Sequence, residues 1–150
     1  MRIEHLALWV HDLEGMRAFY LKYFDTTSGE KYVNSAKRFT AYFILFGEGE
    51  TRLELMTCPD ITAVEVSGGD EVSAGGVTAG GVAAGGGKRG FHLGLAHFTI
   101  SVGGKDRVNA LTERLRQDRF TIFGEPRTTG DGYYESVVLD PEGNVLEISA

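Results

Sequence analysis

The chain has 150 residues, 42% of them hydrophobic and 24% charged, which suits a globular protein with one core or two small modules. Its net charge of −6 at pH 7 argues against nucleic acid or an anionic membrane as a partner. No stretch approaches the about 20 apolar residues of a membrane span, nothing resembles a targeting segment, and the single cysteine, Cys58, suits a reducing cytoplasm.

The first half is predicted to fold as β-α-β-β-β. Asp12 is a good N-cap for a helix whose apolar and aromatic residues recur at helical spacing, so this stripe is expected to face a core. Alternation and β-branched or aromatic content predict the strands. We expect strands at residues 3–10, 31–33, 39–46 and 52–56, the helix at 13–24, and a loop at 26–29.

The middle of the chain has a different composition. Ten of the 21 glycines fall between Gly68 and Gly90, without the lysine and hydroxyl residue of a phosphate-binding loop. This composition predicts a flexible linker or surface loop. The expected organisation is a first module at 1–59, a Gly-rich linker at 60–90 and a second module at 91–150, together forming one domain.

The second half repeats the β-α-β-β-β order. A tight turn, Asp140-Pro141-Glu142-Gly143, predicts that the last two strands form a hairpin, because Pro presets φ and Gly accepts unusual φ values. We expect strands at residues 95–102, 120–123, 133–139 and 145–148, a helix at 105–118 and a loop at 124–132. The predicted fold class is α+β, with two βαβββ modules whose curled mixed sheets surround a metal-binding cleft.

Two histidines and two glutamates repeat almost in register. His97 follows His5 by 92 positions, and Glu147 follows Glu54 by 93. Each histidine lies on the first strand of its module and each glutamate on the last, with apolar neighbours facing the opposite side of the sheet. A single strand histidine or glutamate is more often a solvated or hydrogen-bonded residue than a ligand. The repetition of all four favours an internal duplication that carries a function.

Imidazole nitrogens and carboxylate oxygens suit a borderline divalent ion. If the four side chains converge, they predict a site for Zn, Ni, Co, Mn or Fe, with positions left for water or substrate. Such an ion also offsets the free-energy cost of placing several ionisable groups on an interior sheet face. The predicted metal ligands are His5, Glu54, His97 and Glu147.

These motifs resemble the vicinal oxygen chelate superfamily, which includes glyoxalase I, bleomycin-resistance proteins, an epimerase, fosfomycin-resistance enzymes and extradiol dioxygenases. The resemblance rests on the strands around His5, Glu54 and His97, on Ala18-Phe19-Tyr20, and on the final Asp140–Ile148 segment. It implies paired βαβββ modules around a metal, a small-molecule substrate and a homodimer, with the site formed within one chain or across the dimer.

The His, Glu, His, Glu set is similar to that of glyoxalase I. The resemblance therefore implies a divalent-metal-dependent lyase or isomerase acting on a small carbonyl or hemithioacetal substrate, with the metal stabilising an enediolate. Glu147 is the expected base, which returns the substrate proton to the neighbouring carbon, and Glu54 is the second candidate. Another metalloenzyme of the family, an epimerase or a ring-cleaving dioxygenase, and a non-catalytic binding protein remain alternatives.

One departure from the family concerns the substrate. Trp9 stands where glutathione-dependent bacterial members usually carry an arginine for the glutathione carboxylate, so the expected lactoylglutathione lyase-like metalloenzyme need not use glutathione. Arg127 and Tyr133 are candidates for an anion contact and a cleft wall, although Arg127 also fits a solvated loop position. Trp9, Arg127 and Tyr133 are therefore the expected substrate-binding residues.

Overall fold

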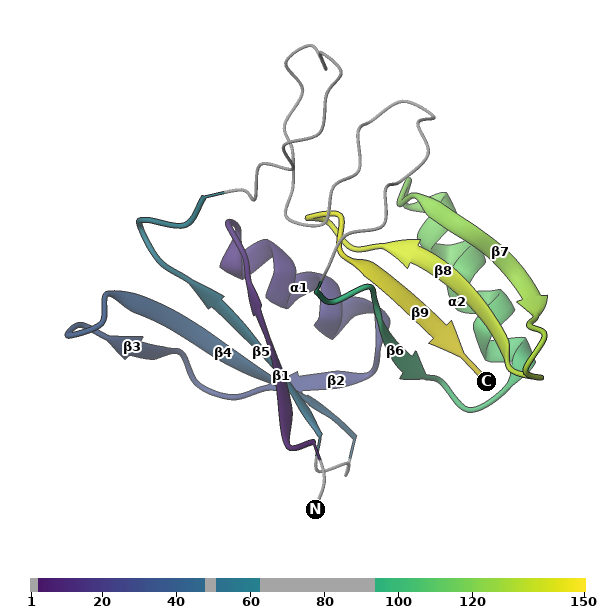
Figure 1. The fold of residues 1–150 in the computed structure, drawn as a ribbon, viewed down its shortest axis with the longest axis horizontal. Coiled ribbons are helices and arrows are strands. Elements are labelled where there is room, and N and C mark those ends of the chain that lie inside the picture. Colours follow the sequence, from purple (N-terminus) through teal and green to yellow (C-terminus); the bar gives the residue numbers. More distant parts are fainter. Residues whose placement is uncertain (1–2, 48–50, 63–93) are drawn as a thin grey trace, which may run out of the picture. The chain divides into compact units, whose positions relative to one another are not determined.

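The computed structural model describes residues 3–47, 51–62 and 94–150, and the chain divides into two compact units, Met1–Thr62 and Ala63–Ala150. Each unit combines one helix with one mixed sheet (Figure 1). The predicted α+β class with two βαβββ modules is confirmed. The Gly-rich linker predicted at 60–90 falls almost wholly outside the described residues.

The first unit orders its strands β1-β5-β4-β2, and the short β3 also pairs with β4. β1 runs parallel to β5, whereas β4 is antiparallel to β5, β2 and β3. Its elements are β1 (His5–Trp9), α1 (Leu13–Tyr23), β2 (Thr26–Ser28), β3 (Tyr32–Asn34), β4 (Phe39–Phe46) and β5 (Arg52–Thr57).

The sequence specifies α1 at both its ends and along its buried face. The Asp12 side chain accepts a hydrogen bond from the backbone N–H of Gly15 at 2.9 Å, which confirms the predicted N-cap. The aromatic stripe is buried as expected, with Met16 and Tyr20 fully inaccessible. Burial of each such side chain contributes on the order of 1.5–3 kcal/mol to stability. The helix therefore covers one face of the sheet and leaves the other open.

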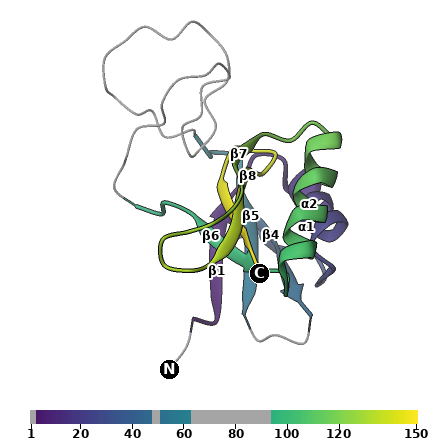
Figure 2. The same ribbon diagram turned by 90° about the vertical axis from the view of Figure 1, so that its right-hand side faces the viewer.

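The second unit has the equivalent order, β6-β9-β8-β7. β6 is parallel to β9, and β7, β8 and β9 are antiparallel neighbours. Its elements are β6 (Phe98–Ser101), α2 (Lys105–Gln117), β7 (Ile122–Thr128), β8 (Tyr134–Leu139) and β9 (Val145–Ser149). In each unit the helix lies on one side of its strands (Figure 2).

The hairpin between β8 and β9 forms as predicted. Asp140 Oδ1 accepts hydrogen bonds from the backbone N–H groups of Glu142 and Asn144, at 3.0 and 2.9 Å. Gly143 adopts a φ of 82°, which glycine reaches without steric cost. The turn fixes the register in which Val137 lies opposite Glu147.

Two of the loop predictions are wrong, because the residues form strands. Residues 26–28 form β2, because Thr26, Thr27 and Ser28 pair with the far end of β4. Residues 124–128 belong to β7, although they include Gly124 and Pro126, because two register irregularities admit these residues into the strand. Both errors arise because hydrogen bonds to a distant strand outweighed local turn composition. Neither α1 nor α2, the helices of the described part, is long and apolar enough to span a bilayer.

Candidate metal and substrate site

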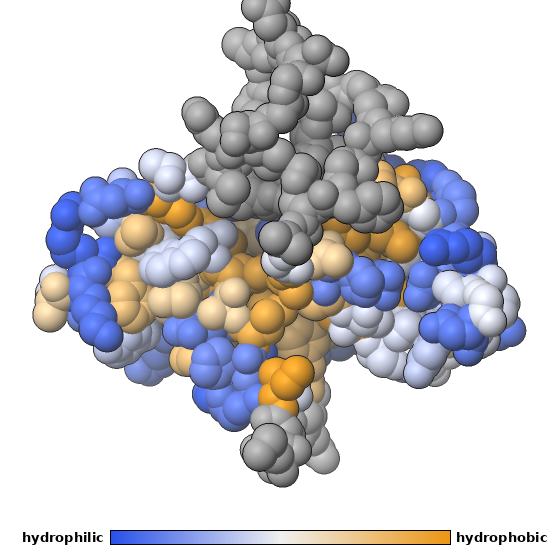
Figure 3. Space-filling view, in the orientation of Figure 1, coloured by the Kyte–Doolittle hydropathy of each residue, from blue (hydrophilic) through white to orange (hydrophobic). Residues whose placement is uncertain are grey.

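The first unit brings His5 and Glu54 together on the open face of its sheet. Glu54 lies directly opposite Ala7 in the parallel pairing, and His5 is two residues before Ala7 on the same face. His5 Nε2 lies 3.7 Å from Glu54 Oε2. The glutamate side chain is 14% exposed and the histidine 40%, so the pair faces a partly open surface. That face carries hydrophobic and hydrophilic side chains together (Figure 3).

The second unit repeats this arrangement with His97 and Glu147. Glu147 lies opposite Thr99, again two residues after the histidine, and the distance from His97 Nε2 to Glu147 Oε2 is 3.3 Å. The Thr99 hydroxyl donates a hydrogen bond to Glu147 Oε2 at 2.8 Å. His97 itself precedes the first residue of β6, so this strand begins later than expected.

The two pairs are held differently, although their positions are equivalent. Ala7 occupies the place of Thr99 and cannot donate a hydrogen bond to Glu54. Conversely, Glu4 precedes His5, whereas the residue before His97 is Ala96. The first unit therefore supports its histidine and the second unit supports its glutamate.

Glu4 links His5 to Arg52. Its carboxylate contacts His5 Nδ1 through one oxygen and the Arg52 guanidinium through the other. The hydrogen bond with His5, and next the one with Arg52, lower the pKa of Glu4, so this carboxylate is ionised at neutral pH. A carboxylate beside Nδ1 favours the proton on that nitrogen and leaves Nε2 free to act as a ligand.

Phe43 completes this group on the neighbouring strand. The Arg52 guanidinium lies 4.2 Å from the centre of the Phe43 ring, and the His5 ring meets Phe43 edge-on with centroids 5.6 Å apart. Both contacts restrict the orientation of His5 and Arg52. The imidazole is therefore positioned directly by Glu4 and Phe43, and Arg52 contacts both of these neighbours.

The His97–Glu147 pair has the spacing of two ligands of one divalent ion, and the His5–Glu54 pair comes close to this spacing. Two donor atoms at about 2.1 Å from an ion, with tetrahedral to octahedral angles, lie about 3.0–3.4 Å apart. The His97–Glu147 separation of 3.3 Å falls in this range, and the His5–Glu54 separation of 3.7 Å exceeds it by a few tenths of an ångström. In the described residues no group of three or more His, Cys, Asp or Glu side chains is placed to hold a metal. Each unit thus brings together one histidine and one glutamate.

A further carboxylate, Glu135, lies on the same face as Glu147. It sits opposite Ser149, next to the Val137–Glu147 pair, and its side chain is 11% exposed. Burial, and then the charge of Glu147, raise the pKa of Glu135, although Arg127 opposes this shift. Arg127 donates to Glu135 Oε1 at 3.2 Å, so the arginine expected in a loop is a strand residue on the face of the His97–Glu147 pair.

The two aromatic residues expected near substrate lie at different places. Trp9 ends β1 on the face of His5, half exposed, and packs edge-on against Phe39 with centroids 6.4 Å apart. Tyr133 immediately precedes β8 and is 62% exposed. Its carbonyl closes the turn by accepting from Thr129. Among the described residues nothing brings Tyr133 against the His97–Glu147 pair.

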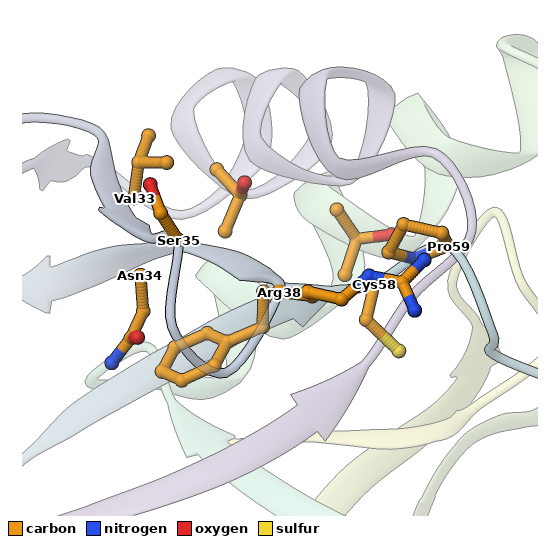
Figure 4. A pocket seen from close by; sticks show the side chains of 9 residues that line it. Val33, Asn34, Ser35, Arg38, Cys58 and Pro59 are labelled. Carbon is orange, nitrogen blue, oxygen red and sulfur yellow. The ribbon is translucent and has the colours of Figure 1, made fainter.

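A shallow pocket of about 500 Å³ lies at one end of the first unit's sheet (Figure 4). It is lined by the turn between β3 and β4 and by the end of β5, including Arg38, Phe39 and Cys58. Arg38 already forms an ion pair with Asp60 at 3.1 Å. The pocket contains neither His5 nor Glu54, and Phe39 connects its edge to Trp9.

Comparisons with known proteins identify the family. Residues 2–148 match the Glyoxalase/Bleomycin resistance protein/Dioxygenase superfamily, so the chain belongs to this superfamily. The family resemblance expected from the motifs is confirmed. No curated protein matches the sequence.

Solved structures share the fold at low sequence identity. Glyoxalase I from Zea mays is 20% identical with a TM-score of 0.68, covering 99% of this chain but only 44% of the maize chain. A glyoxylase/bleomycin resistance protein/dioxygenase domain from Frankia sp. EAN1pec is 16% identical with a TM-score of 0.70, covering 99% and 96%. The trypanothione-dependent glyoxalase I of Leishmania major is 20% identical with a TM-score of 0.64, covering 99% and 86%. This chain thus spans less than half of the maize enzyme, and at these identities the likeness shows the fold alone.

Sequence reasoning did not find the residues that support the pairs. Four such residues contact a predicted site residue or share its face of the sheet: Glu4, Arg52, Thr99 and Glu135. A signal for two of them is visible in the duplication, because Glu4 aligns with Ala96 and Thr99 with Ala7. Differences between the repeats, and not only their identities, mark positions with separate tasks.

Proposed function

We propose that this protein is a divalent-metal-dependent lyase or isomerase of the glyoxalase I type, acting on a small carbonyl or hemithioacetal substrate. The observation that carries the proposal is the pair of histidine and glutamate side chains found at equivalent positions of the two units. Family membership supports the proposal, since that superfamily includes the glyoxalases.

The proposed ligands are His5, Glu54, His97 and Glu147. A bound divalent ion supplies Lewis-acid stabilisation of negative charge that develops on a substrate oxygen. The protein's part is to orient the donors: Glu4 directs His5 through Nδ1, and the Thr99 hydroxyl directs Glu147. The identity of the metal among Zn, Ni, Co, Mn and Fe follows from elemental analysis.

Proton transfer at the carbon next to the carbonyl is assigned to Glu147, with Glu54 as the second candidate. A carboxylate accepts the proton from one carbon and donates it to the neighbouring one, provided that it lies within hydrogen-bond reach of both. Thr99 fixes one oxygen of Glu147 at 2.8 Å and leaves the other oxygen for this transfer. Glu54 has no hydroxyl opposite it, because Ala7 stands there.

Trp9 favours a substrate other than the glutathione hemithioacetal. An indole on the His5 face offers an apolar wall and a single N–H donor, where an anionic thiol adduct requires a cation. We therefore include carbonyl compounds without glutathione among the substrates to be assayed. The same preparation, examined by size-exclusion chromatography, tests the proposed homodimer.

The test is elemental analysis of protein purified without added metal, repeated on His5→Ala and Glu147→Gln, with a methylglyoxal–glutathione assay alongside. Glu14→Gln serves as the control, because Glu14 lies on α1 and pairs with Lys31 at 2.7 Å. We expect bound metal in the parent and the control, and its loss in the two variants. Absence of metal even after loading with Zn²⁺, Ni²⁺ or Mn²⁺ would refute the proposed metal-dependent activity and favour a non-catalytic binding protein.

A further inference from the structure

Two irregularities in β7 place both Gly124 and Arg127 on the face of the sheet that carries Glu147. Gly124 lies opposite Val137 and Arg127 opposite Glu135, so three steps along β7 match two steps along β8. In a regular strand, residues three apart point to opposite faces, so the irregularity between Gly124 and Arg127 is what brings these two residues onto one face. Pro126, which cannot donate a ladder hydrogen bond, lies in this irregular stretch.

The Arg127 guanidinium turns back along the strand and lies over Gly124. A Cβ atom added at Gly124 would meet Arg127 Nη1 at 3.0 Å and the Val137 side chain at 3.1 Å. Glycine thus leaves the space that the guanidinium occupies. Since Val137 is paired with both Gly124 and Glu147, the guanidinium lies at the same level of the sheet as Glu147.

Glu135 anchors the arginine without using all its donors. Arg127 Nη2 donates to Glu135 Oε1 at 3.2 Å, and within the described residues this is its hydrogen-bond partner. A guanidinium has five N–H donors, and half of this side chain is exposed. The remaining donors are therefore available to a ligand on the open face.

We propose that Arg127, resting on Gly124 and held by Glu135, binds a carboxylate of the substrate while the reacting carbonyl lies at Glu147. This inference rests on the function proposed above and names its substrate class: small carbonyl compounds that carry a carboxylate. Gly124 on β7 and Glu147 on β9 lie at the same level, two strand spacings or about 10 Å apart across the sheet. After allowance for contacts of about 3 Å at each end, the remaining span fits about three covalent bonds.

Succinate, a dicarboxylate without a reactive carbonyl, is the probe for this position. Calorimetric titration of the full chain gives its affinity, and the side-chain N–H resonance of Arg127 in labelled protein reports the contact directly. Because the arginine–carboxylate hydrogen bond is charge-assisted, Arg127→Gln should lower the affinity for succinate at least about tenfold, and Arg127→Lys should lower it less. Arg38→Gln is the matched control, since it removes an equal charge from the pocket of the first unit.

The outcomes separate this inference from the proposed function. If metal binds as proposed but succinate affinity is unchanged in Arg127→Gln, or falls only in Arg38→Gln, the anion position is refuted and the metal site stands. If Arg127-dependent succinate binding persists while no metal binds, the anion position stands and the proposed enzymatic function is refuted. Inorganic phosphate is titrated in parallel, and tighter Arg127-dependent binding of phosphate would overturn the carboxylate assignment.

Gly124→Ala tests the same position without removing a charge. Its added methyl group contacts Nη1 and the Val137 side chain, so the guanidinium must move. We expect succinate affinity to fall while Arg127 is still present. Thermal unfolding of this variant is measured first, and if it does not fold, the Arg127→Lys variant decides the question.

Discussion

Replacing Glu4 by glutamine tests whether the first unit positions its histidine. In the structure one Glu4 oxygen contacts His5 Nδ1 and the other contacts Arg52, so the carboxylate favours the tautomer protonated at Nδ1 and restricts the ring orientation. Glutamine keeps an acceptor oxygen but loses the charge and one of the two acceptors. We therefore expect weaker metal binding with little change in fold.

The magnitude follows from the setting of this contact. Loss of a carboxylate that hydrogen-bonds a metal-binding histidine typically reduces metal affinity by about 10–100-fold. Glu4 is 45% exposed and shares its charge with Arg52, so about tenfold, the lower end, is expected for Glu4→Gln. Glu4→Ala removes both acceptor oxygens, so its loss of metal affinity should be larger than that of Glu4→Gln.

The assay is competition with a chromophoric chelator for Zn²⁺ at constant pH, together with nitrogen NMR of the His5 imidazole. Glu14→Gln is the matched control, because it loses the same charge from α1, where Glu14 pairs with Lys31. Equal Zn²⁺ affinities in Glu4→Gln and Glu14→Gln, with an unchanged His5 tautomer, would refute the reasoning. Ala96→Glu offers the converse test, since it gives His97 the neighbour that His5 has.

Three further predictions concern stability. The raised pKa of Glu135 means that this carboxyl keeps its proton to higher pH in the folded state than in the unfolded state, so stability falls as pH rises above the ordinary value of 4.5. Glu135→Gln should lack this fall when urea unfolding is measured across pH. The same dependence of stability on pH in parent and variant would contradict the assignment. Thr112→Val should cost about 1–3 kcal/mol, because the buried Ser136 hydroxyl, 2.7 Å away, loses its acceptor; adding Ser136→Ala should recover part of the loss, and a purely additive double variant would argue against the bond. Asp140→Ala removes the acceptor of two backbone N–H groups and should cost about 1–3 kcal/mol in denaturant unfolding, with no loss expected if the turn is held by Gly143 alone.

The sequence determined the elements whose cause is local. Asp12 and the apolar stripe behind it specify α1, and Asp140 to Gly143 specify the final turn, because caps and turns depend on residues a few positions apart. Strand alternation also assigned His5 and Glu54 to one face, which the parallel pairing confirms. The duplicated spacing pointed to the same residues as the candidate site.

Only the tertiary structure decided what depends on register. Thr26–Ser28 became a strand because the end of β4 offered free hydrogen-bonding groups, a fact of pairing that local composition does not carry. The irregularities of β7 put Gly124 and Arg127 on one face, whereas simple alternation separates residues three apart. Glu4 reaches Arg52 across 48 positions because β1 and β5 are adjacent and parallel. The sequence thus located the candidate ligands, and strand pairing determined which neighbours hold them, since those contacts join residues that are distant along the chain.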